Sequence, residues 1–166
     1  MAIDNPTVPN YKRFYIQHGS NQTASDTLAA WGFLAKSTPY SALPKPKDPY
    51  RNEYLDRDGD DEFVESMSYS SFEFDVQFYI RATGQSAAVD IRSRMAAFFS
   101  AVKEGEFMVY DEYTALGRRK VRYAGCKEED FRERSGTARC IFTITFKCND
   151  PSTFMTMEGG AIIPVE

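Results

Sequence analysis

The chain has 166 residues, of which 42% are hydrophobic, and this length is enough to bury one core. Aromatic residues make up 14% of it, with 13 Phe and 10 Tyr against one Trp, and such a composition favours β-strands. Its net charge of −4 argues against a general nucleic-acid binder. The sequence has neither a signal-peptide core nor a run of about 18 apolar residues. We therefore expect a soluble protein that is made in the cytoplasm and has no membrane partner. Three cysteines without CxxC spacing indicate neither a disulfide framework nor a zinc site, so reduced thiols are expected.

The first predicted strand covers residues 11–17, "YKRFYIQ", and His18 follows as a strand-end or turn residue. Four prolines in "PYSALPKPKDPY" disfavour regular structure and favour an extended, polyproline-like segment. We therefore expect a long arm or loop over about residues 35–65. Such arms bind by strand addition or by placing anchor side chains in a groove, and the predicted anchors are Tyr40, Leu43, Tyr50 and Tyr54.

Two segments show the alternation of a half-buried strand, which has a period of two residues. In "SFEFDVQFYI" (71–80) the inward side chains would run from Phe72 to Ile80, and in "CIFTITFKC" (140–148) from Cys140 to Cys148. Residues 106–112 and 119–125 read as further strands, and Ser135-Gly136 is predicted to form a hairpin turn. The strands imply a shared core.

Between these strands the apolar period changes to that of a helix. Apolar side chains recur at spacings of four, three and four, which draws one stripe along a helix; its members are Ile91, Met95, Phe98 and Val102. Ser86 is the expected N-cap and Gly105 the expected stop. The residues therefore predict a β-rich domain with one packed helix.

The stretch 55–63, "LDRDGDDEF", contains five carboxylates, namely Asp56, Asp58, Asp60, Asp61 and Glu62. An EF-hand loop needs oxygen ligands at positions 1, 3 and 5, glycine at position 6 and Glu at position 12. Asp56, Asp58 and Asp60 fit the first three, but Asp61 and Met67 occupy the other two, and no flanking helices are expected. A solvated acidic loop is the favoured interpretation, and a calcium-dependent binding module is an alternative.

A catalytic site has little support in the sequence. Asp60 and Glu62 are the one pair that suggests an acid and a base, so a small carboxylate-based hydrolase is a further alternative. No cleft is indicated, and neither a GxSxG motif nor a Gly-rich phosphate loop is present. We therefore predict that the protein is not an enzyme and has no cofactor.

A basic stretch offers a counterpart to the acidic loop. "GRRKVR" contributes four positive charges, those of Arg118, Arg119, Lys120 and Arg122. Residues 53–65 hold seven acidic side chains against Arg57 alone, which leaves six net negative charges. An exposed basic strand is favoured over a single-stranded nucleic-acid site in which bases stack on nearby tyrosines. Opposite patches can pair within one chain, or join identical subunits head to tail in a ring or filament.

The order of several segments resembles the distal tail family of phage tail proteins over about residues 30–151. The segments are "WGFLAK", "PKPKDPY", "DRDGDDEF", "FEFDVQFYI", the helix, "YAG" and "FTITFKCNDP". The acidic turn of that family matches Asp58, Gly59 and Asp60. The end of the family's last long strand, with the Asp-Pro that follows it, matches Phe146, Cys148, Asp150 and Pro151.

The resemblance implies a mainly β (α+β) fold, an antiparallel β-sandwich flanked by one α-helix. It also implies a hexameric ring at the distal end of the virion tail, with other tail proteins as partners and a lumen that could pass DNA. Related folds build tail tubes and tail terminators, which are alternatives. The expected organisation is a single domain at 1–151 and a C-terminal tail at 152–166, without a second, receptor-facing domain. The acidic residues Asp56, Asp58, Asp60, Asp61 and Glu62 and the basic residues Arg118, Arg119, Lys120 and Arg122 would join the four arm anchors at the subunit interface.

Overall fold

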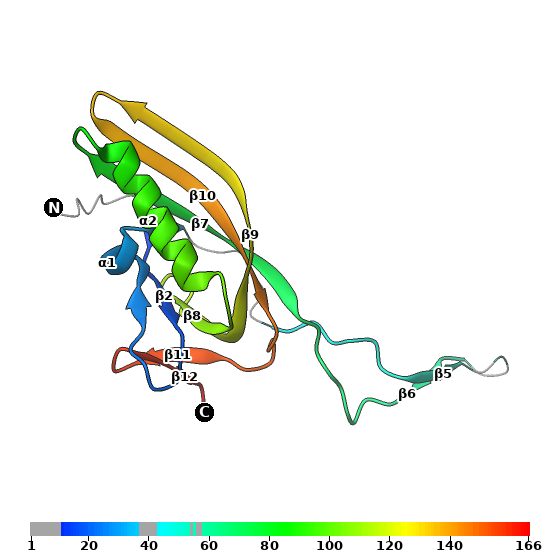
Figure 1. Cartoon of the computed structure of the whole chain (residues 1–166). Coiled ribbons are helices and arrows are strands. Elements are labelled where there is room, and N and C mark those ends of the chain that lie inside the picture. Colours follow the sequence, from blue (N-terminus) through cyan, green and yellow to red (C-terminus); the bar gives the residue numbers. More distant parts are fainter. Residues whose placement is uncertain (1–10, 37–42, 54, 56–57) are drawn as a thin grey trace.

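The computed structural model describes residues 11–36, 43–53, 55 and 58–166 (Figure 1). It confirms the predicted class, an antiparallel β-sandwich with one main helix. Ten strands form a sheet in which eight follow the order β1-β4-β7-β10-β9-β8-β2-β3, while β11 pairs with β9 and β12. The strands are β1 (Tyr11–Lys12), β2 (Phe14–Gln17), β3 (Ser25–Asp26), β4 (Leu34–Lys36), β5 (Arg51–Glu53), β6 (Asp60–Glu62), β7 (Phe72–Thr83), β8 (Phe107–Asp111), β9 (Leu116–Arg134), β10 (Thr137–Cys148), β11 (Met155–Glu158) and β12 (Ala161–Pro164).

The long strands β7 and β10 pair along their whole length, from Phe72↔Cys148 to Thr83↔Thr137. Side chains of alternate residues point to one face and are buried there, as the period of two predicts. Strand β9 pairs with β10 from Val121 to Arg134 and with β8 from Leu116 to Val121, so it belongs to both layers of the sandwich. The predicted strand segments are thus confirmed, and 11–17 is divided into β1 and β2 at Arg13.

Phenylalanine rings fill the space between the two layers. Phe14 on β2 stacks on Phe146 of β10, with ring centroids 6.1 Å apart, and meets Phe78 of β7 edge to face at 5.7 Å. Phe107 of β8 also contacts Phe146. Burying rings of this size supplies much of the hydrophobic free energy of a small domain, and their edge-to-face contacts fix how the layers pack.

Helix α2 (Ala87–Val102) covers one face of the sheet (Figure 1). Ile91, Phe98 and Val102 of the predicted stripe are buried, and Met95 packs partly against the core. Ser86 occupies the N-cap position but makes no side-chain capping hydrogen bond. A second, one-turn helix that the sequence pattern did not predict, α1 (Thr27–Trp31), is capped by the Asp26 side chain and lies close to α2.

The hairpin between β9 and β10 turns at the two predicted residues. Ser135 and Gly136 have φ angles of 51° and 76°. Positive φ at both central residues is the requirement of a type I′ turn, whose twist matches that of the flanking strands. The turn therefore places residues 131–134 directly beside residues 137–140.

The described part of the Pro-rich segment, residues 43–50, is extended and holds no strand, only an isolated bridge between Pro46 and Tyr69. The regular structure of the arm begins after it. Strands β5 and β6 pair as a two-stranded hairpin that projects away from the body (Figure 1). At its base the backbone N–H of Lys47 donates to the carbonyl of Ser68 at 2.9 Å, and that of Ser70 donates to Lys45 at 2.9 Å. The chain therefore runs out and back as a paired ribbon.

Residues 152–166, expected as a tail beyond the domain, contain the hairpin β11–β12 packed on the body. Met155 and Ile162 are buried, and the Ile162 N–H donates to the buried Gln17 side chain at 2.7 Å. Gly117 of β9 permits this packing, because a Cβ there would lie 2.8 Å from the Met155 carbonyl oxygen.

The cysteines differ in accessibility, and this predicts a labelling pattern. Cys140 and Cys148 are buried, which raises the pKa of Cys140 to about 11 and also raises that of Cys148. Cys126 is exposed. We expect iodoacetamide at pH 8 to label Cys126 alone in the native protein and all three thiols in denaturant, as measured by mass spectrometry, since the thiolate must form and be reached. Native labelling of Cys148 would contradict this.

Candidate interaction surface

The hairpin β5–β6 forms the outer part of the arm and is held by few contacts. Arg51 pairs in register with Glu62 and forms ion pairs with Glu53 and Asp60, each at 3.4 Å. These ion pairs are exposed, and such pairs contribute about 0–1 kcal/mol. The Phe63 N–H donates to the Tyr50 carbonyl at 2.9 Å.

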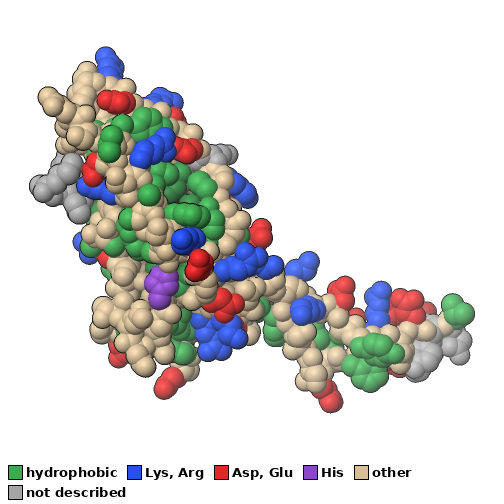
Figure 2. Space-filling model, viewed as in Figure 1, with side chains coloured by type: hydrophobic (Ala, Val, Ile, Leu, Met, Phe, Trp, Pro, Cys, Tyr) green, Lys and Arg blue, Asp and Glu red, His purple; other side chains and the backbone are tan. Residues whose placement is uncertain are grey.

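Apolar side chains on this hairpin are open to solvent. The rings of Tyr50 and Phe63 contact each other at 5.6 Å, yet these residues are 73% and 59% exposed. Val64 beside them is 57% exposed. Figure 2 shows hydrophobic and acidic side chains gathered on the arm, away from the body. A two-stranded hairpin is marginally stable alone, and exposed aromatic clusters mark interaction sites, so the arm is suited to docking on a partner.

Most of the predicted interface residues on the arm are exposed. Leu43, Tyr50, Asp58, Asp60, Asp61 and Glu62 are all exposed. Tyr40, Tyr54 and Asp56 lie outside the described residues. The calcium interpretation depends on Asp56 and therefore stays a prediction, although no three His, Cys, Asp or Glu side chains elsewhere in the described chain gather as metal ligands.

Asp60 and Glu62, the predicted hydrolase pair, both lie on β6 and are exposed on the arm. Asp60 forms its ion pair with Arg51. Both carboxylates are therefore open to solvent on a projecting hairpin.

The basic stretch is not the exposed strand that its sequence predicts, because Arg118 is fully buried. Its guanidinium donates to the Pro151 carbonyl at 2.9 Å and lies over the rings of Phe154 and Phe72, at 4.6 and 5.5 Å from their centroids. Arg118 thus fixes residues 151–154 to the body. As part of a subunit interface it was predicted wrongly.

The other three residues of the stretch are accessible to different extents. Arg119 is half-buried and forms an ion pair with Asp150. Lys120 and Arg122 are exposed, and the Arg122 side chain donates to the Tyr123 carbonyl at 3.2 Å. Part of the predicted basic charge is therefore neutralised within the chain.

Asp150 holds the turn that follows β10. It accepts hydrogen bonds from the Thr153 hydroxyl at 2.9 Å and from the Thr153 N–H at 3.3 Å, besides its ion pair with Arg119. Burial alone would raise the pKa of Asp150, but the hydrogen bonds from Arg119 and Thr153 outweigh it, and the pKa is lowered. The carboxylate is thus more stable in the folded chain than in the unfolded one.

The lowered pKa predicts an acid-sensitive contribution to stability. The stabilisation is complete above the unfolded-state pKa of about 3.9 and is lost as the pH falls through the lower folded-state value. We expect Asp150→Asn to lower the free energy of unfolding by about 1–2 kcal/mol at pH 7, with a smaller difference from wild type at pH 3, in urea titrations at both pH values. Asp130→Asn, which removes an exposed ion pair with Arg132, should cost about 0.5 kcal/mol or less. Equal losses in both variants at pH 7 would contradict the assignment.

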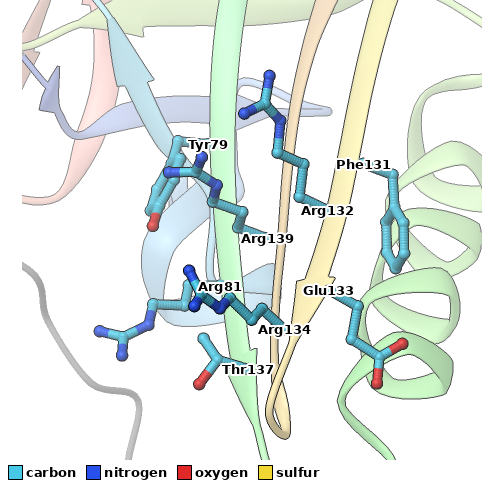
Figure 3. A pocket seen from close by; sticks show the side chains of 8 residues that line it. All are labelled: Tyr79, Arg81, Phe131, Arg132, Glu133, Arg134, Thr137 and Arg139. Atoms are coloured by element: carbon cyan, nitrogen blue, oxygen red, sulfur yellow. The ribbon is translucent and has the colours of Figure 1, made fainter.

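Sequence reasoning missed a second basic group, on the open face of the sheet. This arginine cluster consists of Arg81, Arg132, Arg134 and Arg139. Figure 3 shows these side chains directed to one side of the strands, while Phe131 and Glu133 point to the other side. They line a groove of about 800 Å³ together with Tyr79, Phe131, Glu133 and Thr137. The arginines occupy outward-facing positions of β7, β9 and β10, which strand alternation can indicate. They come together only because these strands pair, and the sequence does not reveal that pairing.

Comparison with known proteins gives a likeness of fold to a solved structure. No family model matches the chain, and no curated protein matches it. Among solved structures, the Dit protein (gp 19.1) of SPP1, described as a paradigm of the hub adsorption apparatus in phages infecting Gram-positive hosts, matches with a TM-score of 0.55 and 16% identity. The two proteins share a fold.

The likeness to SPP1 Dit covers 88% of this chain and 53% of that protein. The chain thus spans about half the length of the Dit protein that it matches. The match agrees with the family resemblance of the sequence at the level of the fold. Within the described residues, no helix is long and apolar enough to cross a membrane.

Proposed function

We propose that this chain is a non-enzymatic structural subunit of a phage or prophage tail, which assembles with copies of itself as a ring at the distal end of the tail. As the resemblance to the distal tail family implies, the proposed ring is hexameric, lies in the virion tail and binds other tail proteins. The shared fold with SPP1 Dit supports a tail role. A tail-tube or tail-terminator subunit is the alternative position for the same fold.

The observation that carries the proposal is the arm. A hairpin with exposed Tyr50 and Phe63 projects from a body whose own core it does not complete. Aromatic side chains of this kind act as anchors when a partner buries them, and each anchor contributes about 2 kcal/mol or more to binding. In a protein that forms rings, the arm of one copy would reach the surface of the next and close the assembly through a repeated head-to-tail contact.

The test is the state of association of the full chain. Sedimentation velocity over a wide concentration range, with negative-stain microscopy of the largest species, is expected to show a closed ring with a hollow centre. Association should weaken as salt rises, since exposed charges on the arm contribute to it. A monomer at every concentration, whatever the salt, would refute the proposal. A compact dimer without a central hole would refute the ring.

A further inference from the structure

The arginine cluster is created by strand register. Arg139 on β10 lies directly opposite Arg81 on β7 and opposite Arg132 on β9, so three guanidinium side chains form a row across three neighbouring strands. Arg134 lies in the next outward row, opposite Thr137. All four arginines are exposed. Side chains opposite each other on neighbouring strands are about 5 Å apart at Cβ, so these groups share one small area.

A row of like charges is unfavourable for the folded chain by itself. Like charges placed directly opposite in a sheet destabilise the pair. Asp130 forms an ion pair with Arg132 at 3.1 Å, but both side chains are more than half exposed. The groove itself is lined by four arginines and one carboxylate, that of Glu133, which points to the helix side of the sheet. The open face at this end therefore keeps a net positive charge, which a partner with several carboxylates would neutralise.

The arm of the same chain carries such carboxylates but leads away from the cluster. It joins the body at the start of β7, near Phe72, whereas Arg81 lies nine residues further along that strand, about 30 Å away at 3.3 Å per residue. The hairpin extends outward from this joint, on the side opposite to the β9–β10 turn (Figure 1). The acidic hairpin β5–β6 and the arginine cluster of one chain thus lie at opposite ends of the molecule.

We propose that the arginine cluster of one copy receives the acidic hairpin of a second copy. Guanidinium groups bind carboxylates through paired, charge-assisted hydrogen bonds, and the hairpin presents Asp58, Asp61 and Glu62 on exposed positions. Because donor and acceptor surfaces lie at opposite ends of each molecule, the contact is head to tail. This inference rests on the proposed function, and it places the receiving surface on β7, β9 and β10 in place of the basic stretch 118–122.

Charge reversal tests the pairing. We expect Arg132→Glu with Arg139→Glu, and separately Asp58→Lys with Glu62→Lys, to weaken self-association at least tenfold in sedimentation experiments. Combining all four changes in one chain should restore most of the lost affinity. The matched control is Arg122→Glu with Lys147→Glu, a pair in register at the other end of the same strands, which should change the affinity less than twofold.

A cross-linking measurement covers the case in which a reversed variant does not fold. In a Cys126→Ser background, mixing Asp61→Cys with Arg139→Cys should give a covalent dimer with a short bis-maleimide, while either variant alone should not. Arg122→Cys mixed with Asp61→Cys should remain monomeric. Cross-linking through the position of Arg122 in place of that of Arg139 would overturn the inference.

The outcomes separate the inference from the proposed function. Association that persists after reversal of Arg132 and Arg139 overturns the inference and leaves the ring intact. A wild-type chain that never associates overturns both. Loss of binding to a short single-stranded DNA in the arginine variant, with association unchanged, would assign the cluster to nucleic acid and also overturn the inference.

Discussion

Replacing residues 48–67 by an Asn-Gly turn is expected to abolish self-association while leaving the thermal midpoint of the dissociated monomer unchanged. Lys47 and Ser68 are already hydrogen-bonded across the arm, so a two-residue turn can join them without strain. The deletion removes Tyr50, Phe63 and the acidic residues together. Loss of two anchors of about 2 kcal/mol each corresponds to a weakening on the order of a thousandfold.

The stability half of this prediction follows from where the core lies. Among the described residues, the buried hydrophobic side chains stop at Ala35 and begin again at Phe74, so the arm contributes none of them. At protein concentrations low enough for the wild type to be monomeric, thermal unfolding of the shortened chain should therefore match that of wild type. The full-length variant Tyr50→Ala with Phe63→Ala is the control, and it should associate more weakly than wild type without a change in chain length. A shortened chain that still forms the wild-type assembly would show that the arm is not the docking element.

Arg118→Ala is expected to lower the free energy of unfolding by about 3 kcal/mol or more. The substitution leaves the Pro151 carbonyl without its donor, at a cost of about 1–3 kcal/mol, and opens a cavity between the rings of Phe72 and Phe154. Urea unfolding followed by circular dichroism measures the change. Residues 151–154 should also become more accessible to proteases.

Arg122→Ala is the matched control for this effect. Arg122 lies on the same strand but is exposed, so its loss should change stability by about 0.5 kcal/mol or less. If the two variants unfold at the same urea concentration, the structural role of Arg118 is refuted. The comparison also explains why charge reversal at Arg118 is unsuitable as an assembly test, since it would damage the fold first.

Arg118 illustrates why part of the site could not be predicted. The prediction for residues 119–125 treated them as a regular strand whose side chains alternate between two faces. In the structure Lys120 has a φ of 51°, and the pairing of β8 with β9 shifts in register between Phe107 and Val109. The irregularity turns both Arg118 and Val121 inward, three residues apart. A local bulge of this kind reassigns the faces of a strand and leaves little trace in residue type.

Other features were predictable because local physics decides them. The alternation in β7 and β10, the stripe of α2 and the turn at Ser135-Gly136 each depend on neighbouring residues, and all are confirmed. The arginine cluster depends instead on pairing between residues 81 and 139, which are far apart in sequence. The packing of the hairpin β11–β12 was unpredictable for the same reason, because its Ile162 N–H bonds to Gln17, which is far away in the sequence.

The way in which the large sheet ends has a consequence for how the protein avoids aggregation. Its terminal strand β3 is two residues long, so it offers few backbone groups for another sheet to extend. Short edge strands are a means by which β-proteins avoid uncontrolled aggregation. Crowded copies would then meet through side chains that are specific to one orientation, and misassembly by fibril-like growth would be suppressed.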